Sequence, residues 1–248
     1  MVSSPMITCV VLPSYNESLN IVPLVDAILS LSENTMVCVV DDSSPDGTSE
    51  VIRLRQRESP AWSSRVHLIT RRVKNGRGGA VREGLRWAFD GSEAFDSFIE
   101  MDCDFSHDPA AIPEGLHFLA EGADVALGVR YPGGTILGWP LRRRIFSRVA
   151  NTLARGLIHP AIHDYTNGFR FYNRRAARLL LSKPQRYVGY IYLSESLSYF
   201  LKAGMTIRCF PIRFKNRTRG ASNTSLKEIA NAFAGIIKIG LAHRFTNS

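Results

Sequence analysis

Two aspartates stand one residue apart directly after an apolar run. The segment FIEMDCD ends an apolar stretch with Asp102 and Asp104. Like charges repel, and buried strands favour apolar residues, so the pair needs a reason. Carboxylates at i and i+2 just past a strand suit Mg²⁺ or Mn²⁺, whose remaining positions diphosphate oxygens and water would fill. The competing interpretation is a helix cap, but Asp108-Pro109 supplies that cap and the pair stands too early for it.

Two other apolar runs also end in polar residues. Pro13, Tyr15 and Glu17 follow the first run, where we expect Pro13 to stop the strand, and Asp41 and Asp42 end the second. A tyrosine face can stack on a base, and carboxylates can accept hydrogen bonds from a base or ribose. Turn and capping chemistry explains the same residues without a ligand, so both interpretations stay open at this point.

Four arginines follow predicted strands or begin helices, namely Arg130, Arg143, Arg170 and Arg217. The planar guanidinium matches phosphate oxygens. Any one of them could be a solvated surface charge. Four at predicted loops and helix starts together favour a ligand that carries one or more phosphates.

The elements that must position these residues alternate along the chain. Continuous apolar runs predict strands at 7–12, 36–41, 65–70, 97–102 and 124–129. Helical spacing predicts helices at 20–31, 80–90 and 109–121. Strands that alternate with helices, and are apolar throughout, form a mostly parallel sheet covered by helices on both faces. In such α/β folds the ligand binds beyond the carboxyl ends of the strands, where the polar residues gather.

Two further helices are amphipathic and basic. Residues 141–157 repeat an apolar residue every four positions, opposite arginines, and 226–245 carry a second apolar stripe. Each could pack in the core or lie in a membrane interface. Residues 206–214 predict a last strand. The glycines of NGRGGA at 75–80 predict a turn before the helix.

The composition limits the function classes. The chain has 248 residues, 45% hydrophobic and 21% charged, with net charge +9, which favours anionic partners. Acidic pairs at the strand ends would repel nucleic acid, so we expect no nucleic-acid partner. A dinucleotide-binding glycine loop would follow the first strand, where PSYNES stands instead. Four scattered cysteines without CxxC spacing favour reduced thiols in the cytoplasm. No stretch reaches about 18 uncharged apolar residues, so we expect no membrane-spanning helix.

Taken together, these segments resemble the inverting family 2 glycosyltransferases of the GT-A fold, and among them the dolichol-phosphate mannose synthases. The matching segments cover about residues 7–222 and are LPSYNE, VVDDSSPDGT, GRGGAVREGL, MDCDFSHDP, LGVRYPGG, GWPLRRRIFSRVAN, DYTNGFRFY and PIRFKNRTRGAS. The resemblance implies a catalytic domain over 1–222 and a C-terminal amphipathic helix within 223–248.

The resemblance also implies roles for single residues. The nucleoside of a sugar nucleotide would lie on Pro13, Tyr15, Glu17 and Asp42, with Asp41 beside them. Asp102 and Asp104 would hold Mg²⁺ or Mn²⁺ and the diphosphate, with Cys103 between them in the donor site. Acceptor or donor phosphates would be held by Arg130, Arg143, Ser147, Arg217 and Ser222. The family usually has Lys after that serine, whereas Asn223 stands here, and Lys227 is a candidate replacement.

The implied reaction moves a sugar, with mannose from GDP-mannose as the first expectation, onto a polyprenyl or dolichyl phosphate. The implied location is the cytosolic face of a membrane, as a peripheral protein, with a small membrane-anchoring subunit as a further candidate partner. Two alternatives stay open. One is transfer of glucose or GlcNAc from a UDP-sugar to the same lipid, and the other is a family 2 transferase with a non-lipid acceptor.

Overall fold

The protein is built on one seven-stranded sheet. The computed structural model describes residues 6–74, 76–91, 94–216 and 226–245, with side chains in the last range from residue 231 onward. The strand order is β3-β2-β1-β4-β7-β5-β8, and only β7 runs antiparallel to its neighbours. The strands are β1 Thr8–Ser14, β2 Thr35–Asp41, β3 Val66–Thr70, β4 Ser97–Glu100, β5 Val125–Val129, β7 Arg170–Asn173 and β8 Ile207–Pro211. The predicted α/β class with a mostly parallel sheet is confirmed.

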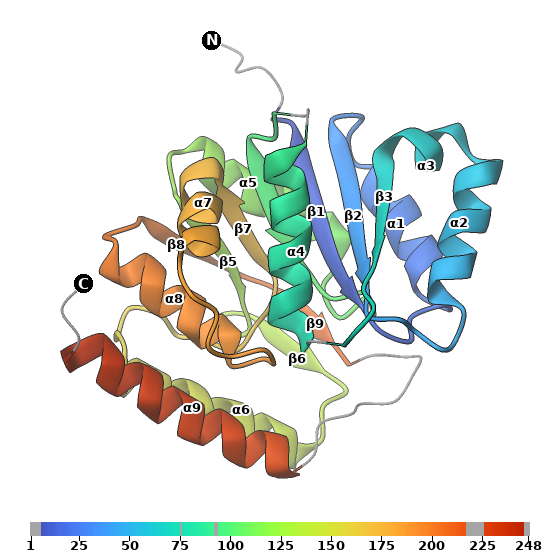
Figure 1. Ribbon diagram of the computed structural model, residues 1–248. Helices are drawn as coiled ribbons and strands as arrows, with labels where there is room; N and C mark the ends of the chain where they lie inside the picture. Colours follow the sequence, from blue (N-terminus) through green and yellow to red (C-terminus); the bar gives the residue numbers. More distant parts are fainter. Residues whose placement is uncertain (1–5, 75, 92–93, 217–225, 246–248) are drawn as a thin grey trace.

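Helices cover both faces of this sheet (Figure 1). One face carries α4, α7 and α8, and the other carries α1 and α5, with α2 and α3 beside α1. The helices are α1 Ile21–Leu29, α2 Thr48–Glu58, α3 Pro60–Arg65, α4 Gly76–Asp90, the 3₁₀ turn η1 Pro109–Ala111, α5 Ile112–Ala120, α6 Leu141–Leu157, α7 Arg174–Ser182, α8 Tyr192–Lys202 and α9 Leu226–Phe245. A second, two-stranded sheet joins β6 Thr135–Leu137 to β9 Arg213–Lys215.

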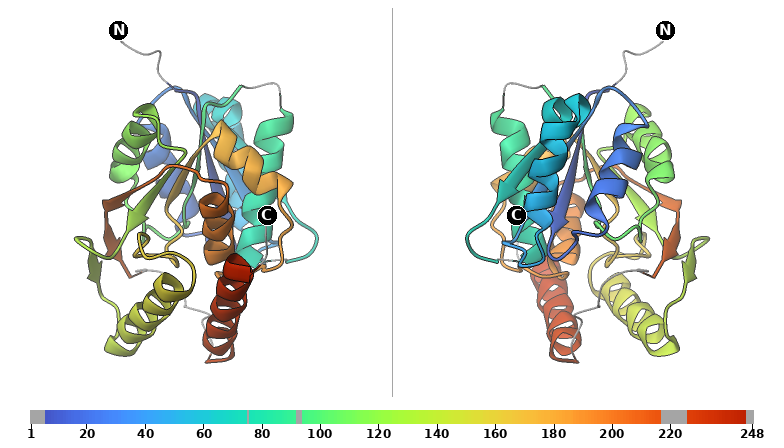
Figure 2. Two further views of the ribbon diagram at one scale, coloured as in Figure 1. Left: turned by 90° about the vertical axis from the view of Figure 1, so that its left-hand side faces the viewer. Right: turned by 90° about the vertical axis from the view of Figure 1, so that its right-hand side faces the viewer.

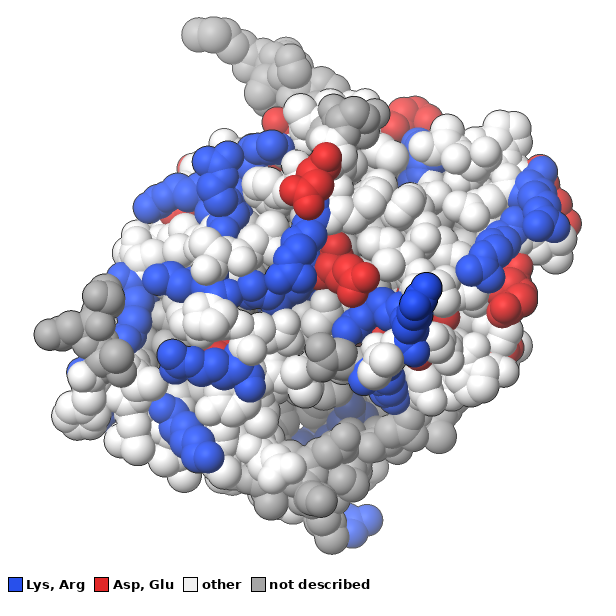
Figure 3. All heavy atoms as spheres, viewed as in Figure 1, with Lys and Arg blue, Asp and Glu red and all other residues white. Residues whose placement is uncertain are grey.

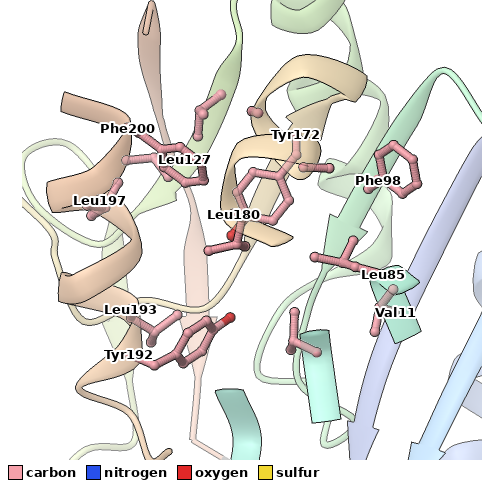
Figure 4. Close-up of a cluster of buried hydrophobic side chains, with 14 of the residues drawn as sticks. Val11, Leu85, Phe98, Leu127, Tyr172, Leu180, Tyr192, Leu193, Leu197 and Phe200 are labelled. Atoms are coloured by element: carbon pink, nitrogen blue, oxygen red, sulfur yellow. The ribbon is translucent and has the colours of Figure 1, made fainter. Parts of the chain in front are cut away.

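The strands are apolar throughout because both of their faces are buried. In β1, Cys9 and Val11 point into one core, while Val10 and Leu12 point into the other. Figure 4 shows part of the first core, where Val11 and Leu85 lie on one side and aromatic side chains of β7 and α8 on the other. Covered parallel strands therefore lose the polar alternation of a one-sided sheet.

Four of the differences from the sequence-based predictions concern how strands end and helices begin. β1 continues through Pro13 to Ser14, because Pro13 still pairs in register with Val40 of β2. β4 ends at Glu100, two residues before the predicted end, so Asp102 lies in a loop. The glycines from Gly76 onward belong to α4 and do not form a turn before it. The last predicted strand divides at Ile212 into β8 and β9, each in a different sheet.

The helices α6 and α9 form a separate layer below the carboxyl edge of the sheet (Figures 1 and 2). The predicted ranges 141–157 and 226–245 are confirmed as helices. Gly240 of α9 packs so closely on Leu157 that a Cβ would lie 2.4 Å from the Leu157 Cβ. The Arg244 Nε donates to the Leu157 carbonyl at 3.1 Å. Among the described residues, none of the helices is both long and apolar enough to cross a membrane.

Candidate active site

Three adjacent strands deliver the predicted donor-site residues to one edge. Because β2, β1 and β4 are neighbours and parallel, the loops after them meet beyond their carboxyl ends. Each of these loops holds one non-glycine residue at positive φ: Asn16 at 61°, Ser43 at 52° and Phe105 at 58°. Such conformations are strained for side-chain-bearing residues and cluster at functional sites. All three positive-φ non-glycine residues that the structure describes therefore lie at this edge.

Asp41 holds the loop after β2. It is fully buried, and its carboxylate accepts hydrogen bonds from the Ser49 hydroxyl at 2.9 Å and from the Ser44 backbone N–H at 3.1 Å. The Ser44 hydroxyl also donates to it. These bonds show that Asp41 stabilises the turn after β2. Turn and capping chemistry is one of the two interpretations that the sequence left open. The nucleoside contact stays a prediction for Asp41 and for its neighbour Asp42.

Asp42 and Tyr15 lie where a nucleoside could contact them. The Arg71 guanidinium pairs with Asp42 at 2.8 Å, yet burial outweighs this pairing and raises the pKa of Asp42. The Lys74 ammonium lies 3.4 Å from the centre of the Tyr15 ring. This cation–π contact places a basic group at the aromatic face predicted to stack on a base. Lys74 and Arg71 are two site residues that sequence reasoning missed.

The two aspartates after β4 differ in exposure. The Asp102 side chain is 20% exposed, whereas Asp104 is 7% exposed and accepts from the Ser106 backbone N–H at 3.0 Å. Cys103 between them is buried and donates its Sγ–H to the Pro13 carbonyl at 3.4 Å. Burial raises the pKa of this thiol, so it stays protonated and is a poor metal ligand. Its position ties the aspartate loop to β1.

Arg77 is the largest omission of the sequence analysis. Its guanidinium binds Glu100 at 2.6 Å and Asp102 at 2.9 Å, and it also donates to the Gly168 carbonyl at 3.1 Å. The Glu100 side chain is 1% exposed, and the Tyr192 hydroxyl donates to it as well. A buried carboxylate requires such a partner. Arg77 therefore neutralises Glu100 and holds one oxygen of Asp102 in a defined direction.

The glycines of GRGGA explain how Arg77 reaches this position. A Cβ on Gly78 would lie 2.6 Å from the Tyr192 ring, and one on Gly84 would lie 2.5 Å from Val11. Only glycine allows α4 to approach α8 and β1 so closely. The signal was present in the sequence as an arginine between glycines, but its acidic partners lie 23 and 25 residues away.

His107 holds the loop that carries Asp102 and Asp104 through hydrogen bonds of both ring nitrogens. Its Nδ1 accepts from the Asp102 backbone N–H at 3.1 Å, and its Nε2 lies 2.9 Å from the Asn167 side-chain oxygen. The Asn167 amide nitrogen donates to the Gly128 carbonyl, which leaves its oxygen facing the ring. The network thus assigns the proton to Nε2. Burial lowers the pKa of His107, in agreement with a neutral ring.

Arg130 is the first of the predicted phosphate-binding arginines. It follows β5 and is 5% exposed. Its guanidinium donates two hydrogen bonds to the Asp164 carboxylate, from Nε at 2.9 Å and from Nη2 at 2.8 Å. Its Nη2 also donates to the Thr166 hydroxyl at 2.7 Å, and Asn151 of α6 donates to the same hydroxyl at 3.3 Å. Asp164 therefore holds Arg130 rigidly, and the negative charges of Asp164 and Asp102 contribute to raising its pKa.

Arg143 and Ser147 stand on the first turns of α6, close to this group. The Arg143 Cζ lies 4.1 Å from the centre of the Trp139 ring, and its Nη1 donates to Asn216 at 3.1 Å. The Asn151 amide nitrogen contacts the Ser147 carbonyl at 2.9 Å. Arg170 is fully buried among backbone carbonyls and the Ser196 hydroxyl, so its predicted phosphate contact is wrong. Arg217, Ser222, Asn223 and the side chain of Lys227 lie outside the described residues.

The arrangement joins a carboxylate half to an arginine half. Acidic oxygens at β4 suit a divalent cation with a diphosphate, and fixed guanidinium groups at β5 and α6 suit a second anion. Among the described residues, His, Cys, Asp and Glu form no group of three or more that could hold a metal ion.

Solved structures share this fold. The glucosyl-3-phosphoglycerate synthase of Mycobacterium tuberculosis, in a complex with Mn²⁺, UDP and phosphoglyceric acid, aligns with a TM-score of 0.68 at 20% identity. The alignment covers 98% of this chain and 80% of that one. A complex of the same enzyme with Mg²⁺ and UDP aligns with a TM-score of 0.66. The chain thus has the GT-A-like α/β fold.

The sequence assigns the family. Residues 9–181 match the model of glycosyl transferase family 2, and the chain belongs to that family. A polyprenol monophosphomannose synthase of Mycolicibacterium smegmatis is 34% identical over 96% of this chain and 88% of that protein. An undecaprenyl-phosphate mannosyltransferase of Micrococcus luteus is 30% identical over 95% of this chain and 94% of that protein. The chain is therefore a glycosyltransferase, as the motifs at the strand ends predict.

Proposed function

We propose that the protein transfers mannose from GDP-mannose, with inversion, to a polyprenyl phosphate. The observation that carries the proposal is the pairing of the Asp102–Asp104 loop with fixed arginines at β5 and α6. The first half suits the diphosphate of a sugar nucleotide, and the second suits a phosphate acceptor. The names of the two relatives, both mannosyltransferases of polyprenyl phosphates, support the same sugar and acceptor.

The chemistry requires little from a general base. The anomeric carbon of the donor develops oxocarbenium character as the diphosphate leaves. A phosphate monoester has a second pKa near ~6, so the acceptor is largely dianionic at pH 7 and is already nucleophilic. The difficulty is to bring two polyanions together. Arg130 and Arg143 would hold the acceptor phosphate for in-line attack and offset its repulsion from the donor.

The carboxylates fit Mg²⁺ or Mn²⁺. Hard oxygen donors, and a cysteine kept protonated by burial, match these ions better than a softer metal. Asp102 and Asp104 would hold the ion, and Arg77 keeps Asp102 in place. When bound, the metal would neutralise the charge that develops on the leaving diphosphate.

One assay decides between the candidate activities. The purified chain is incubated with a short polyprenyl phosphate, Mg²⁺ or Mn²⁺, and radiolabelled GDP-mannose, UDP-glucose or UDP-GlcNAc. We expect labelled lipid from GDP-mannose. Labelled lipid from a UDP-sugar alone would select the first alternative, and the absence of labelled lipid with every donor would overturn the lipid acceptor.

We propose further that α6 lies in a membrane interface. Leu141, Ile145 and Val149 are 72%, 50% and 50% exposed, although they form the apolar stripe of the helix. Arg142 and Arg148 are exposed beside them, and α6 contains no acidic residue. Such a surface matches the cytosolic face of an anionic membrane, where each basic residue adds about 1 kcal/mol.

The partner helix α9 extends this surface. Ile237, Leu241 and Phe245 of α9 are also exposed. Figure 3 shows a mostly uncharged surface over the described part of α9, with a few basic side chains and no acidic one. We propose residues 1–222 as the catalytic domain and 223–248 as an interfacial segment. A small anchoring subunit stays a candidate partner on this layer.

A charge placed in the exposed stripe tests the membrane surface. We expect Ile145→Asp to weaken binding to phosphatidylglycerol-containing vesicles about tenfold, because an apolar contact is lost and a repulsive charge is added. Flotation with vesicles measures the effect. Leu54→Asp, at an exposed leucine of α2, is the matched control and should leave binding unchanged. An equal loss of vesicle binding in both variants would contradict the proposal that α6 lies in the interface.

Arg217 is tested by its effect on the acceptor. We expect Arg217→Ala to raise the KM for polyprenyl phosphate about tenfold, as expected for a lost charge-assisted bond. The KM for GDP-mannose should stay unchanged. Arg57→Ala, at an exposed arginine of α2, controls for a general loss of positive charge. An unaltered acceptor KM in Arg217→Ala would exclude its assigned contact.

A further inference from the structure

Trp139 occupies the centre of the arginine half of the site. It precedes α6 by two residues and is 7% exposed. Its ring centre lies 4.1 Å from the Arg143 Cζ and 5.1 Å from the Arg130 Cζ. The Phe214 ring meets it edge-on at 5.3 Å. One indole ring therefore contacts both arginines that the proposed reaction assigns to phosphate.

The indole N–H of Trp139 has no acceptor in the part of the chain that the structure describes. Its Nε1 is buried, and no described residue accepts from it. The buried Trp62 shows the usual arrangement, because its Nε1 donates to Asp26 at 2.6 Å. Leaving a buried donor unpaired is unfavourable, and about 90% or more of buried polar groups are paired. An unpaired N–H on a ring that contacts two guanidinium groups thus indicates an acceptor that is not part of the described chain.

The surroundings determine the chemistry of that acceptor. Both guanidinium groups only donate hydrogen bonds, so they favour an anion with several acceptor oxygens. The first turn of α6 adds to this preference, since it contains no acidic residue and Pro140 provides no capping side chain. The backbone N–H groups at a helix N-terminus and the helix dipole favour negative charge. A phosphate meets all of these requirements.

We propose that the Trp139 indole N–H donates a hydrogen bond to the acceptor phosphate, while its ring positions the Arg130 and Arg143 guanidinium groups around the same anion. This inference rests on the proposed function and extends it by one binding residue. The indole serves two purposes here. It stacks with the cations through its ring and contributes a donor through its nitrogen.

A direct test observes the indole N–H itself. The chain has three tryptophans, so ¹⁵N-indole labelling yields three N–H resonances, and Trp139→Phe identifies the one of interest. Farnesyl phosphate should move the Trp139 resonance downfield, and farnesol, which lacks the phosphate, should not. A Trp139 resonance that is unmoved by bound farnesyl phosphate, or equally moved by farnesol, would overturn the inference.

Kinetics provide the second readout. Trp139→Phe keeps an aromatic ring and removes the donor, so the KM for polyprenyl phosphate should rise about tenfold while the KM for GDP-mannose stays constant. Trp62→Phe, which makes the same change at a paired indole, should lower thermal stability without altering the acceptor KM. An unchanged acceptor KM in Trp139→Phe would refute the role of Trp139 even in an active enzyme. A wild-type chain that labels no lipid would instead overturn the proposed function.

Discussion

Asp104→Ala is expected to lower the rate of mannose transfer at least about a thousandfold while the protein stays folded. Asp104 is buried in the loop that follows β4, where the proposal places the diphosphate. Removing a carboxylate that holds a divalent cation removes its stabilisation of the leaving group, which is worth several kcal/mol. Radiolabelled lipid formation measures the rate, and circular dichroism checks the fold.

Two variants isolate the charge at position 104. Asp104→Asn keeps the shape and an acceptor for the Ser106 backbone N–H, so it should stay folded and inactive. Asp108→Ala removes a nearby carboxylate whose bond to the Ala110 backbone N–H, at 3.0 Å, caps the following turn. It should cost about 1 kcal/mol of stability and leave transfer nearly intact. Near-normal activity in Asp104→Asn would remove the metal-binding role.

Arg77→Gln is expected to affect both stability and activity. It leaves the Glu100 carboxylate buried without its cation, and breaking such a pair costs about 3–5 kcal/mol. For a domain of this size, this loss lowers the melting temperature by about 10 °C. Asp102 also loses the bond that directs its carboxylate, so the concentration of Mg²⁺ or Mn²⁺ needed for half-maximal activity should rise.

Two further variants separate these effects. Arg77→Lys keeps the positive charge but loses the planar fork that binds Glu100 and Asp102 together, so it should keep more stability than activity. In the Arg77→Gln background, Glu100→Gln removes the buried charge and should restore stability without restoring activity. If the double variant regains both, Arg77 acts only on the fold and not on Asp102.

Much of the fold and of the donor site could be predicted from the sequence. The apolar strands and helices repeat with clear periods, and in a parallel sheet the carboxyl ends of the strands must meet. Asp42 and Asp102 therefore lie in loops at the same edge, because Asp42 follows β2 directly and Asp102 comes two residues after the end of β4. The cap at Asp108 was predictable for the same reason, since it depends on its neighbours in the chain alone.

Only the tertiary structure decided which groups pair across long separations. In the sequence, Arg77 is one residue of a glycine-rich segment, whereas the fold places it beside Glu100 and Asp102. The sequence predicts Arg170 as a phosphate ligand, whereas in the structure it lies on the antiparallel strand β7, buried among carbonyl groups. In both cases the meaning of a charge depends on its burial and its partners, which local sequence does not contain.

The two amphipathic helices show the same division. Periodicity located α6 and α9, because an apolar stripe every three to four residues is a property of the chain itself. It left open whether each stripe is covered, since that depends on what the rest of the fold places against it. In the structure Leu153 packs on the core, whereas Leu141 and Ile145 stay exposed. The sequence thus determined the elements and the donor motifs. Tertiary packing decided which charges are paired and which apolar surface stays open, because both depend on contacts between distant segments.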